Sequence, residues 1–282
     1  MDLGECVVSR TYILHPSNWR VLLIQDSCFL ACVAFGILLW KGIDTTTTNP
    51  DMATWWNLGF GEVTSSSIIR WSKPMLGDSG LIRNVLLANL PQVVLSTMYL
   101  IYNQIYTCMA FANEYASFFH RRQSIRVTRP QGLQRSTRFL TLPYRYMIPL
   151  MAASAATHFI LSQGFFLVAV DVFNNEGHLV KDQAILTVGF SVIALVILVI
   201  VICIGAVLTF VLGYRRYKPG MAFAGSCSAA ISAACHVAEF ENGKDAAEQQ
   251  VQWGVVSSQN GQGHLSFSSG PVSEPISGRL YI

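Results

Sequence analysis

Charged residues are scarce in this sequence. Only 12% of its 282 residues are Asp, Glu, Lys or Arg, which is about half the share in an ordinary soluble domain. Apolar residues make up 52%, and the mean hydropathy is +0.41. This balance excludes an intrinsically disordered chain and a typical water-soluble enzyme. The composition is typical of a membrane protein.

Recognisable catalytic and cofactor motifs are also lacking. The sequence has no serine nucleophile elbow, no phosphate-binding glycine loop and no His-Glu-x-x-His zinc motif. We therefore expect no catalytic residues and no nucleotide or flavin cofactor, although an enzyme is not excluded. The seven cysteines show no disulfide framework. The first 20 residues contain four charged side chains and no apolar core, which is not the pattern of a cleaved signal peptide.

Four apolar stretches predict membrane-spanning helices. About 20 mostly apolar residues cross a hydrocarbon core of about 30 Å. The strongest stretch has no charged residue between Asp182 and Arg215. The weakest contains Asp26 near its start, and a buried soluble helix is its alternative. We expect an all-α integral membrane protein with four transmembrane helices, near residues 21–40, 85–112, 147–170 and 185–214.

Arginine is concentrated between the second and third predicted spans. This segment, 113–146, contains half of the arginines in the chain and one acid, Glu114. Arginine-rich loops stay in the cytoplasm, so we predict that this loop and both termini are cytoplasmic; the plasma membrane and an internal membrane fit equally well. Anionic lipids or an acidic or phosphorylated partner would suit these guanidinium groups. Nucleic acid is not expected, because no binding fold accompanies them. The residues are Arg121, Arg122, Arg126, Arg129, Arg135, Arg138 and Arg145.

Residues 215–282 form a predicted cytoplasmic tail that docks on the membrane domain, residues 1–214. Two alternating apolar runs, 251–256 and 264–267, predict short strands in this tail. The uncharged stretch Ala222–Ala234 is too short to cross a bilayer as a helix. It predicts a small-residue helix buried against its neighbours, and a re-entrant or interfacial segment is the alternative.

The tail also contains a candidate set of metal ligands. Cysteine and histidine are common zinc ligands, but their spacing here is unlike that of a zinc finger. Packing of free thiols in a reducing compartment is the alternative explanation. The candidate ligands are Cys227, Cys235, His236 and His264.

Several polar side chains lie inside the second and third predicted spans. Pro91 predicts a kink beside Asn89 and Gln92, and His158 lies near the middle of the third span. Such groups commonly join helices by hydrogen bonds, yet ionisable residues within a span are also functional candidates. The alternative is a ligand or transport path lined by Asn89, Gln92, Asn103, Gln104, His158 and Gln163.

A family resemblance covers most of the chain. Its segments, in order, are Leu87–Ser96, Arg126–Thr137, Gly225–His236, Trp253–Val256 and Gly263–Ser268. They resemble fungal multi-pass membrane proteins of the DUF6536 group, whose function is unassigned, and the chain is similar to the C-terminal half of those proteins. Where that group tends to have a cysteine after Gly-His, this chain has Leu265. The resemblance implies a fungal membrane protein and no specific activity, and it leaves open whether another chain supplies the other half.

These observations predict a non-enzymatic partner subunit, sensor or scaffold in a membrane. Its expected partners are the lipid bilayer, anionic lipids, and either a second copy of the chain or another membrane protein. One alternative is a component of a small-molecule or ion transporter. The other is an accessory protein or enzyme that acts on a lipophilic metabolite within the membrane.

Overall fold

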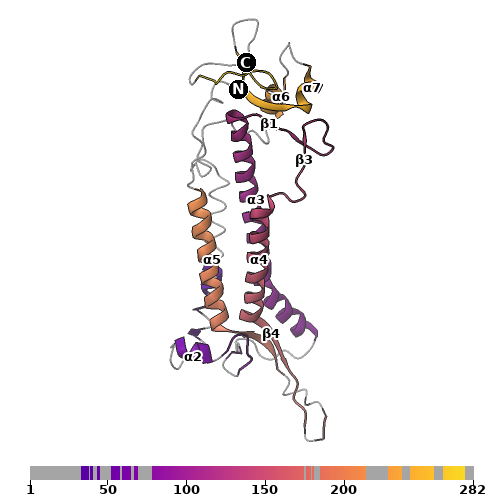
Figure 1. Cartoon of the computed structure of the whole chain (residues 1–282). Coiled ribbons are helices and arrows are strands. Elements are labelled where there is room, and N and C mark those ends of the chain that lie inside the picture. The colour runs from indigo at the N-terminus through magenta and orange to yellow at the C-terminus, as the bar shows by residue number, and fades with distance from the viewer. Residues whose placement is uncertain are drawn as a thin grey trace. The chain divides into compact units, whose positions relative to one another are not determined.

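The computed structural model describes residues 33–37, 39–40, 43–44, 52–57, 59–64, 67–68, 78–174, 176–178, 180, 185–213, 228–236, 242–256 and 263–276. The chain divides into two compact units. We call one the helical unit, which contains Pro16–Asn103 and Arg145–Leu212, and the other the loop–tail unit, which contains Gln104–Tyr144 and Gly213–Ile282. Helix α3 (Asp78–His120) contributes to both units (Figure 1).

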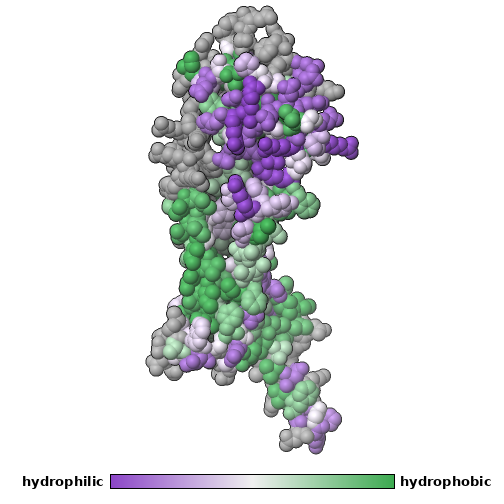
Figure 2. Space-filling model, viewed as in Figure 1, coloured by the Kyte–Doolittle hydropathy of each residue, from purple (hydrophilic) through white to green (hydrophobic). Residues whose placement is uncertain are grey.

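The helical unit is built from the first part of α3 together with α4 (Tyr144–Gly164) and α5 (Val192–Gly213). A short helix, α2 (Met52–Asn57), precedes them. Within the described residues, two helical segments are long and apolar enough to cross a membrane, Leu81–His120 and Val192–Leu212. The second has a mean hydropathy of 3.3, and hydrophobic residues line α5 in Figure 2. This finding concerns length and composition alone.

A β-hairpin connects α4 to α5 where the sequence predicts the ends of two helices. β4 (Phe165–Val170) and β5 (Ile185–Phe190) are antiparallel, with Phe165 opposite Phe190. The predicted span 147–170 is therefore helical only as far as Gly164, and the helix in the predicted span 185–214 begins at Val192. Aromatic and β-branched residues fill both strands, and these residue types favour extended backbone.

The core of the helical unit lies where α3, α4, α5 and the hairpin meet. Leu161 of α4 and Leu198 of α5 are fully buried, and Leu95 of α3 is 5% exposed. Of the predicted span 21–40, the structure describes residues 33–37 and 39–40, all helical. Phe35 from this stretch is 1% exposed and belongs to the same core. Close packing of these side chains stabilises the unit through many small van der Waals contacts.

The loop–tail unit contains a three-stranded antiparallel sheet with the order β1-β6-β7. β6 (Gln250–Val256) and β7 (His264–Ser268) confirm the two strands that the tail sequence predicts. β1 (Gln123–Ser124) comes instead from the arginine-rich segment. The described tail therefore packs with that segment in one unit, whereas the domains expected from the sequence place the segment within residues 1–214.

Two short helices and several aromatic rings complete the loop–tail unit. α6 (Ser228–Ala234) lies inside the predicted small-residue helix and contacts β7. The buried Ser266 hydroxyl donates a hydrogen bond to the Ala234 carbonyl at 3.1 Å. The ring of Phe267 meets that of Phe118 edge-on, with centroids 5.4 Å apart. α7 (Gly243–Glu248) leads directly towards β6.

Candidate functional site

The arginine-rich segment is a folded loop. We call residues 121–143, between α3 and α4, the arginine loop. Two short strands within it, β2 (Arg126–Val127) and β3 (Arg135–Ser136), pair in parallel, with Arg126 opposite Arg135. The pairing closes the loop upon itself, so its arginines have defined positions.

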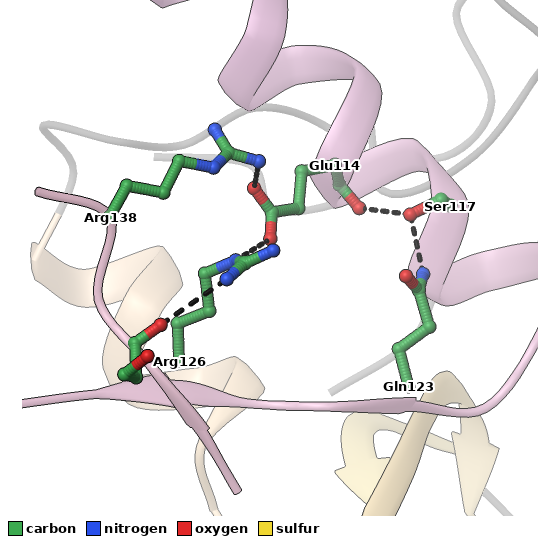
Figure 3. Close-up of polar contacts among 6 residues, drawn as sticks. Glu114, Ser117, Gln123, Arg126 and Arg138 are labelled. Atoms are coloured by element: carbon green, nitrogen blue, oxygen red, sulfur yellow. Dashed lines mark hydrogen bonds and ion pairs between the residues drawn. The ribbon is translucent and has the colours of Figure 1, made fainter. Parts of the chain in front are cut away.

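Glu114 of α3 holds both ends of this closed loop. Its Oε1 accepts a hydrogen bond from Arg126 Nε at 2.8 Å, and its Oε2 accepts one from Arg138 Nη2 at 2.7 Å (Figure 3). The carboxylate side chain is 21% exposed, and the two arginine side chains are 33% and 22% exposed. Charge-assisted hydrogen bonds of this kind are stronger than neutral ones. Both oxygens of Glu114 are occupied, which suits a structural role better than acid–base catalysis.

A second set of hydrogen bonds extends this arrangement along α3. The Ser117 hydroxyl donates to the Glu114 carbonyl at 2.6 Å, and Gln123 Nε2 donates to the Ser117 hydroxyl (Figure 3). Arg126 Nη1 also donates to the Ser136 carbonyl at 3.2 Å. We call Glu114, Ser117, Gln123, Arg126 and Arg138 the Glu114 cluster. Its bonds connect the helix end, β1, β2 and the segment after β3.

The tip of the arginine loop is attached to the end of α7. The Leu133 amide donates to the Glu248 carbonyl at 2.7 Å, and Gln134 Nε2 donates to the Ala247 carbonyl at 2.9 Å. Gly132 has a φ of +56°, and a Cβ added there would lie 2.8 Å from the Glu248 carbonyl oxygen. Only glycine fits this turn without strain and without losing the contact.

The structure sorts the seven predicted arginines into two groups. Arg126 and Arg138 pair with Glu114, Arg122 donates to the carbonyls of Ser269 and Gly270, and the Arg145 guanidinium lies 4.7 Å from the centre of the Tyr146 ring. The other three are exposed, and within the described ranges their guanidinium groups have no hydrogen-bond or ion-pair partner; they are Arg121, Arg129 and Arg135.

Two large apolar side chains of the arginine loop are also exposed. Phe139 is 90% exposed and Leu133 is 60% exposed. Leu133 lies between the exposed Arg129 and Arg135 in the sequence, and Phe139 lies four residues after Arg135. Hydrophilic residues gather over much of the visible face of the loop–tail unit, with hydrophobic ones among them (Figure 2).

Of the residues predicted to line a ligand path, the described contacts bring together Gln92 and His158. Gln92 Oε1 lies 2.6 Å from His158 Nδ1, which joins α3 to α4. Since an amide oxygen only accepts, this contact places a proton on Nδ1. Asn89 Nδ2 instead donates to the Val85 carbonyl of its own helix at 2.8 Å.

The other three candidates of that path are Asn103, Gln104 and Gln163. Gln104 Nε2 lies 3.7 Å from the Cys108 sulfur, one turn along α3. Gln163 lies against the backbone of Gly61, and Asn103 is half-buried on α3. The geometry therefore favours joining of helices at Gln92 and His158 over a continuous polar path.

The candidate metal ligands do not converge in the described part of the chain. Cys235 and His236 are exposed, and the ring centres of His236 and His264 are 6.0 Å apart in an edge-on contact. Cys227 lies outside the described residues. Across the residues that the structure describes, no group of three or more His, Cys, Asp or Glu side chains could hold a metal ion.

Sequence reasoning missed the structural importance of Glu114 and Gly132. The signal for Glu114 was its position as the single acid in an arginine-rich segment, because a lone carboxylate among cations attracts them. The signal for Gly132 was the Pro-Gln-Gly turn at residues 130–132. No sequence signal identifies Phe139 as exposed.

Comparison with known proteins yields one family. A family model described as a domain of unknown function (DUF8419) matches residues 10–281, so the match covers the helical unit and most of the loop–tail unit. No curated protein and no solved structure matches the chain. The matched family is not DUF6536, and the resemblance to that group stays a prediction.

Proposed function

The chain belongs to the DUF8419 family of unknown function, and from this premise we propose that it is a non-enzymatic integral membrane protein that acts as a scaffold or partner subunit. The observation on which the proposal depends most is the surface of α5. This helix of 22 residues contains no charged side chain. Its exposed residues include Ile200 at 52%, Val207 at 60% and Val211 at 61%. Water solvates such a surface poorly, whereas lipid tails cover it at no such cost.

Helix α3 supports the same proposal. Its segment Leu81–His120 has no charged residue between Arg83 and Glu114. Leu86, Leu90 and Leu100 are each at least 60% exposed. A helix satisfies its own backbone hydrogen bonds, so an apolar helix can lie in lipid without unpaired polar groups. Two helices with this property favour insertion in a bilayer over burial inside a soluble core.

The loop–tail unit supports the scaffold part of the proposal. Its arginine loop is held by the Glu114 cluster and by the end of α7, so the exposed arginines lie on a preformed surface. A preformed surface loses little conformational entropy when a partner binds. The clustering of arginine favours a cytoplasmic position for this unit, in the plasma membrane or an internal membrane.

Membrane insertion is tested by alkaline extraction of membranes from cells that produce the full chain. We expect the protein to remain in the membrane pellet at high pH and to dissolve only after detergent is added. Release at high pH without detergent would contradict membrane insertion.

The scaffold role is tested separately by native mass spectrometry of the detergent-solubilised protein. A second protein or a second copy in fixed ratio is expected, and a bare single chain would contradict that role.

A transport function receives less support from the geometry. It depends on a continuous set of polar side chains, whereas Asn89 and Gln104 bond within α3 and Gln92 bonds to His158. Uptake measurements would favour transport if His158→Ala abolished uptake while the variant still inserted and folded. The proposed scaffold predicts that this substitution changes stability instead.

A further inference from the structure

We propose that the exposed part of the arginine loop binds anionic phospholipid headgroups at the surface of the bilayer. Arg121, Arg129 and Arg135 would contact the phosphate and carboxylate groups, and Leu133 and Phe139 would enter the interfacial layer. This inference rests on the proposed function as a membrane protein, and it identifies which side chains of the loop meet the lipid.

The contacts of the arginines are the first support. Arg122, Arg126 and Arg138 donate to carbonyl or carboxylate oxygens of the protein, so these bonds use part of their donor capacity. Arg121 and Arg129 are exposed and, within the described ranges, have no such acceptor for their side chains; the same holds for Arg135. A guanidinium group presents a planar fork of donors that matches a phosphate or carboxylate. Each of these three exposed groups is therefore available to an anion.

Exposure of Phe139 is the second support. The ring is 90% exposed. An apolar environment would favour this ring, because burying an aromatic side chain removes a large apolar area from water. Arg138 is fixed on Glu114 at 2.7 Å, which holds the backbone beside Phe139. Leu133, 60% exposed, is held by its amide bond to Glu248. At the boundary between headgroups and acyl chains, arginines can bind the headgroups while neighbouring apolar side chains enter the acyl layer.

Continuity with α4 favours lipid over a soluble acidic partner. Phe139 precedes Tyr144, the first residue of α4, by five positions along the chain. Tyr144 is 57% exposed and Tyr146 is 51% exposed, with Arg145 between them. Tyrosine and arginine at the start of a membrane helix are typical of the bilayer interface. An extended chain spans at most about 3.6 Å per residue, so at most about 18 Å of chain separates Phe139 from Tyr144.

The test uses the full chain in detergent, titrated with phosphatidylserine or with phosphatidylcholine, and bound lipid is counted by native mass spectrometry. We expect preferential retention of phosphatidylserine. The combined variant R121Q/R129Q/R135Q should weaken binding of phosphatidylserine on the order of 100-fold, because each cation near an anionic surface contributes about fivefold. Its melting temperature should be unchanged, since these side chains form no bond with other described residues.

Matched single variants distinguish this surface from other exposed charged or apolar side chains of the protein. Arg129→Gln should weaken phosphatidylserine binding about fivefold, whereas Arg83→Gln, at an exposed arginine of the helical unit, should leave it unchanged. Phe139→Ser should weaken retention of both lipids. Phe173→Ser, at a ring that is 61% exposed in the helical unit, is the corresponding control and should have no effect.

Three results would overturn the lipid proposal. They are equal retention of phosphatidylserine by the wild type and the combined variant, equal retention of the two lipids by the wild type, and complete displacement of the lipid by inorganic phosphate. If the wild type retained an acidic protein and the combined variant did not, that protein would be the partner of this surface instead of lipid. Alkaline extraction tests membrane insertion independently, so a failure of the proposed function can be told apart from a failure of this inference.

Discussion

Among single residues, Glu114 determines how the arginine loop is arranged. One carboxylate accepts from Arg126 on one side of the loop and from Arg138 on the other. Cations that are close in sequence repel one another, and the shared anion offsets this repulsion. Loss of the Glu114 carboxylate would leave two partly buried guanidinium groups without their acceptor. The free-energy cost of that exceeds the stabilisation that an exposed ion pair provides.

Glu114→Gln should destabilise the loop–tail unit by about 1–3 kcal/mol. The amide has one acceptor oxygen and a donor nitrogen, so it can accept from only one of the two arginines and faces the other with N–H groups. Limited trypsin digestion of the full chain checks this, because the opened loop should be cut faster after Arg135 and Arg138. Glu176→Gln, at an exposed glutamate of the helical unit, is the control. Equal cleavage rates in all three proteins would show that Glu114 does not hold the loop.

Gly132 allows a sharper comparison, because Gly177 has a similar backbone. Their φ angles are +56° and +78°, but an added Cβ meets the Glu248 carbonyl at Gly132 and nothing within 4 Å at Gly177. An alanine at either site costs about 1–2 kcal/mol in backbone strain. Gly132→Ala should cost about 1 kcal/mol more, through the weakened Leu133–Glu248 bond. Thermal unfolding of both variants measures the difference, and an equal or larger effect at Gly177 would contradict this role for the tip.

Among the elements, the sequence predicted α3, α5 and the two tail strands, and it missed the hairpin. Hydropathy locates apolar segments well, because α3 and α5 are long and nearly free of charge. The residues of β4 and β5 are equally apolar, so hydropathy alone cannot distinguish them from the ends of the adjoining helices. Phe165 pairs with Phe190, which is far from it in the sequence. The pattern of apolar residues along a short segment contains no information about such a contact.

The contact between α3 and α4 at Gln92 and His158 can be measured by a double-mutant cycle. Gln92→Leu and His158→Phe should show a coupling energy of about 0.6–1.7 kcal/mol, the range for hydrogen bonds between helices in a membrane. Asn89→Leu combined with His158→Phe should show almost none, because Asn89 bonds to its own helix. Unfolding free energies in mixed detergent give both values. Absence of coupling between Gln92 and His158 would show that this contact does not stabilise the packing of α3 on α4.

For the whole molecule, sequence and structure agree on apolar helices and differ on how the remaining parts are grouped. The domains expected from the sequence place the arginine loop in residues 1–214 and the tail in residues 215–282, whereas the described tail shares a sheet with the arginine loop. The register between Gln123 and Val251 depends on residues far apart in the chain, which composition and periodicity do not connect. The DUF8419 match across residues 10–281 extends over parts of both units.

The central claim is that the chain crosses a membrane with its arginine loop on the cytoplasmic side. Single substitutions create glycosylation sites that report this in intact cells. Glu176→Thr completes the sequence Asn174-Asn175-Thr in the segment between β4 and β5, and Arg135→Asn creates Asn-Ser136-Thr137 in the arginine loop. A cytoplasmic arginine loop predicts a glycan, seen as reduced mobility on a gel and removed by glycosidase, for Glu176→Thr and none for Arg135→Asn. A glycan on Arg135→Asn would place the arginine loop in the lumen and contradict the account.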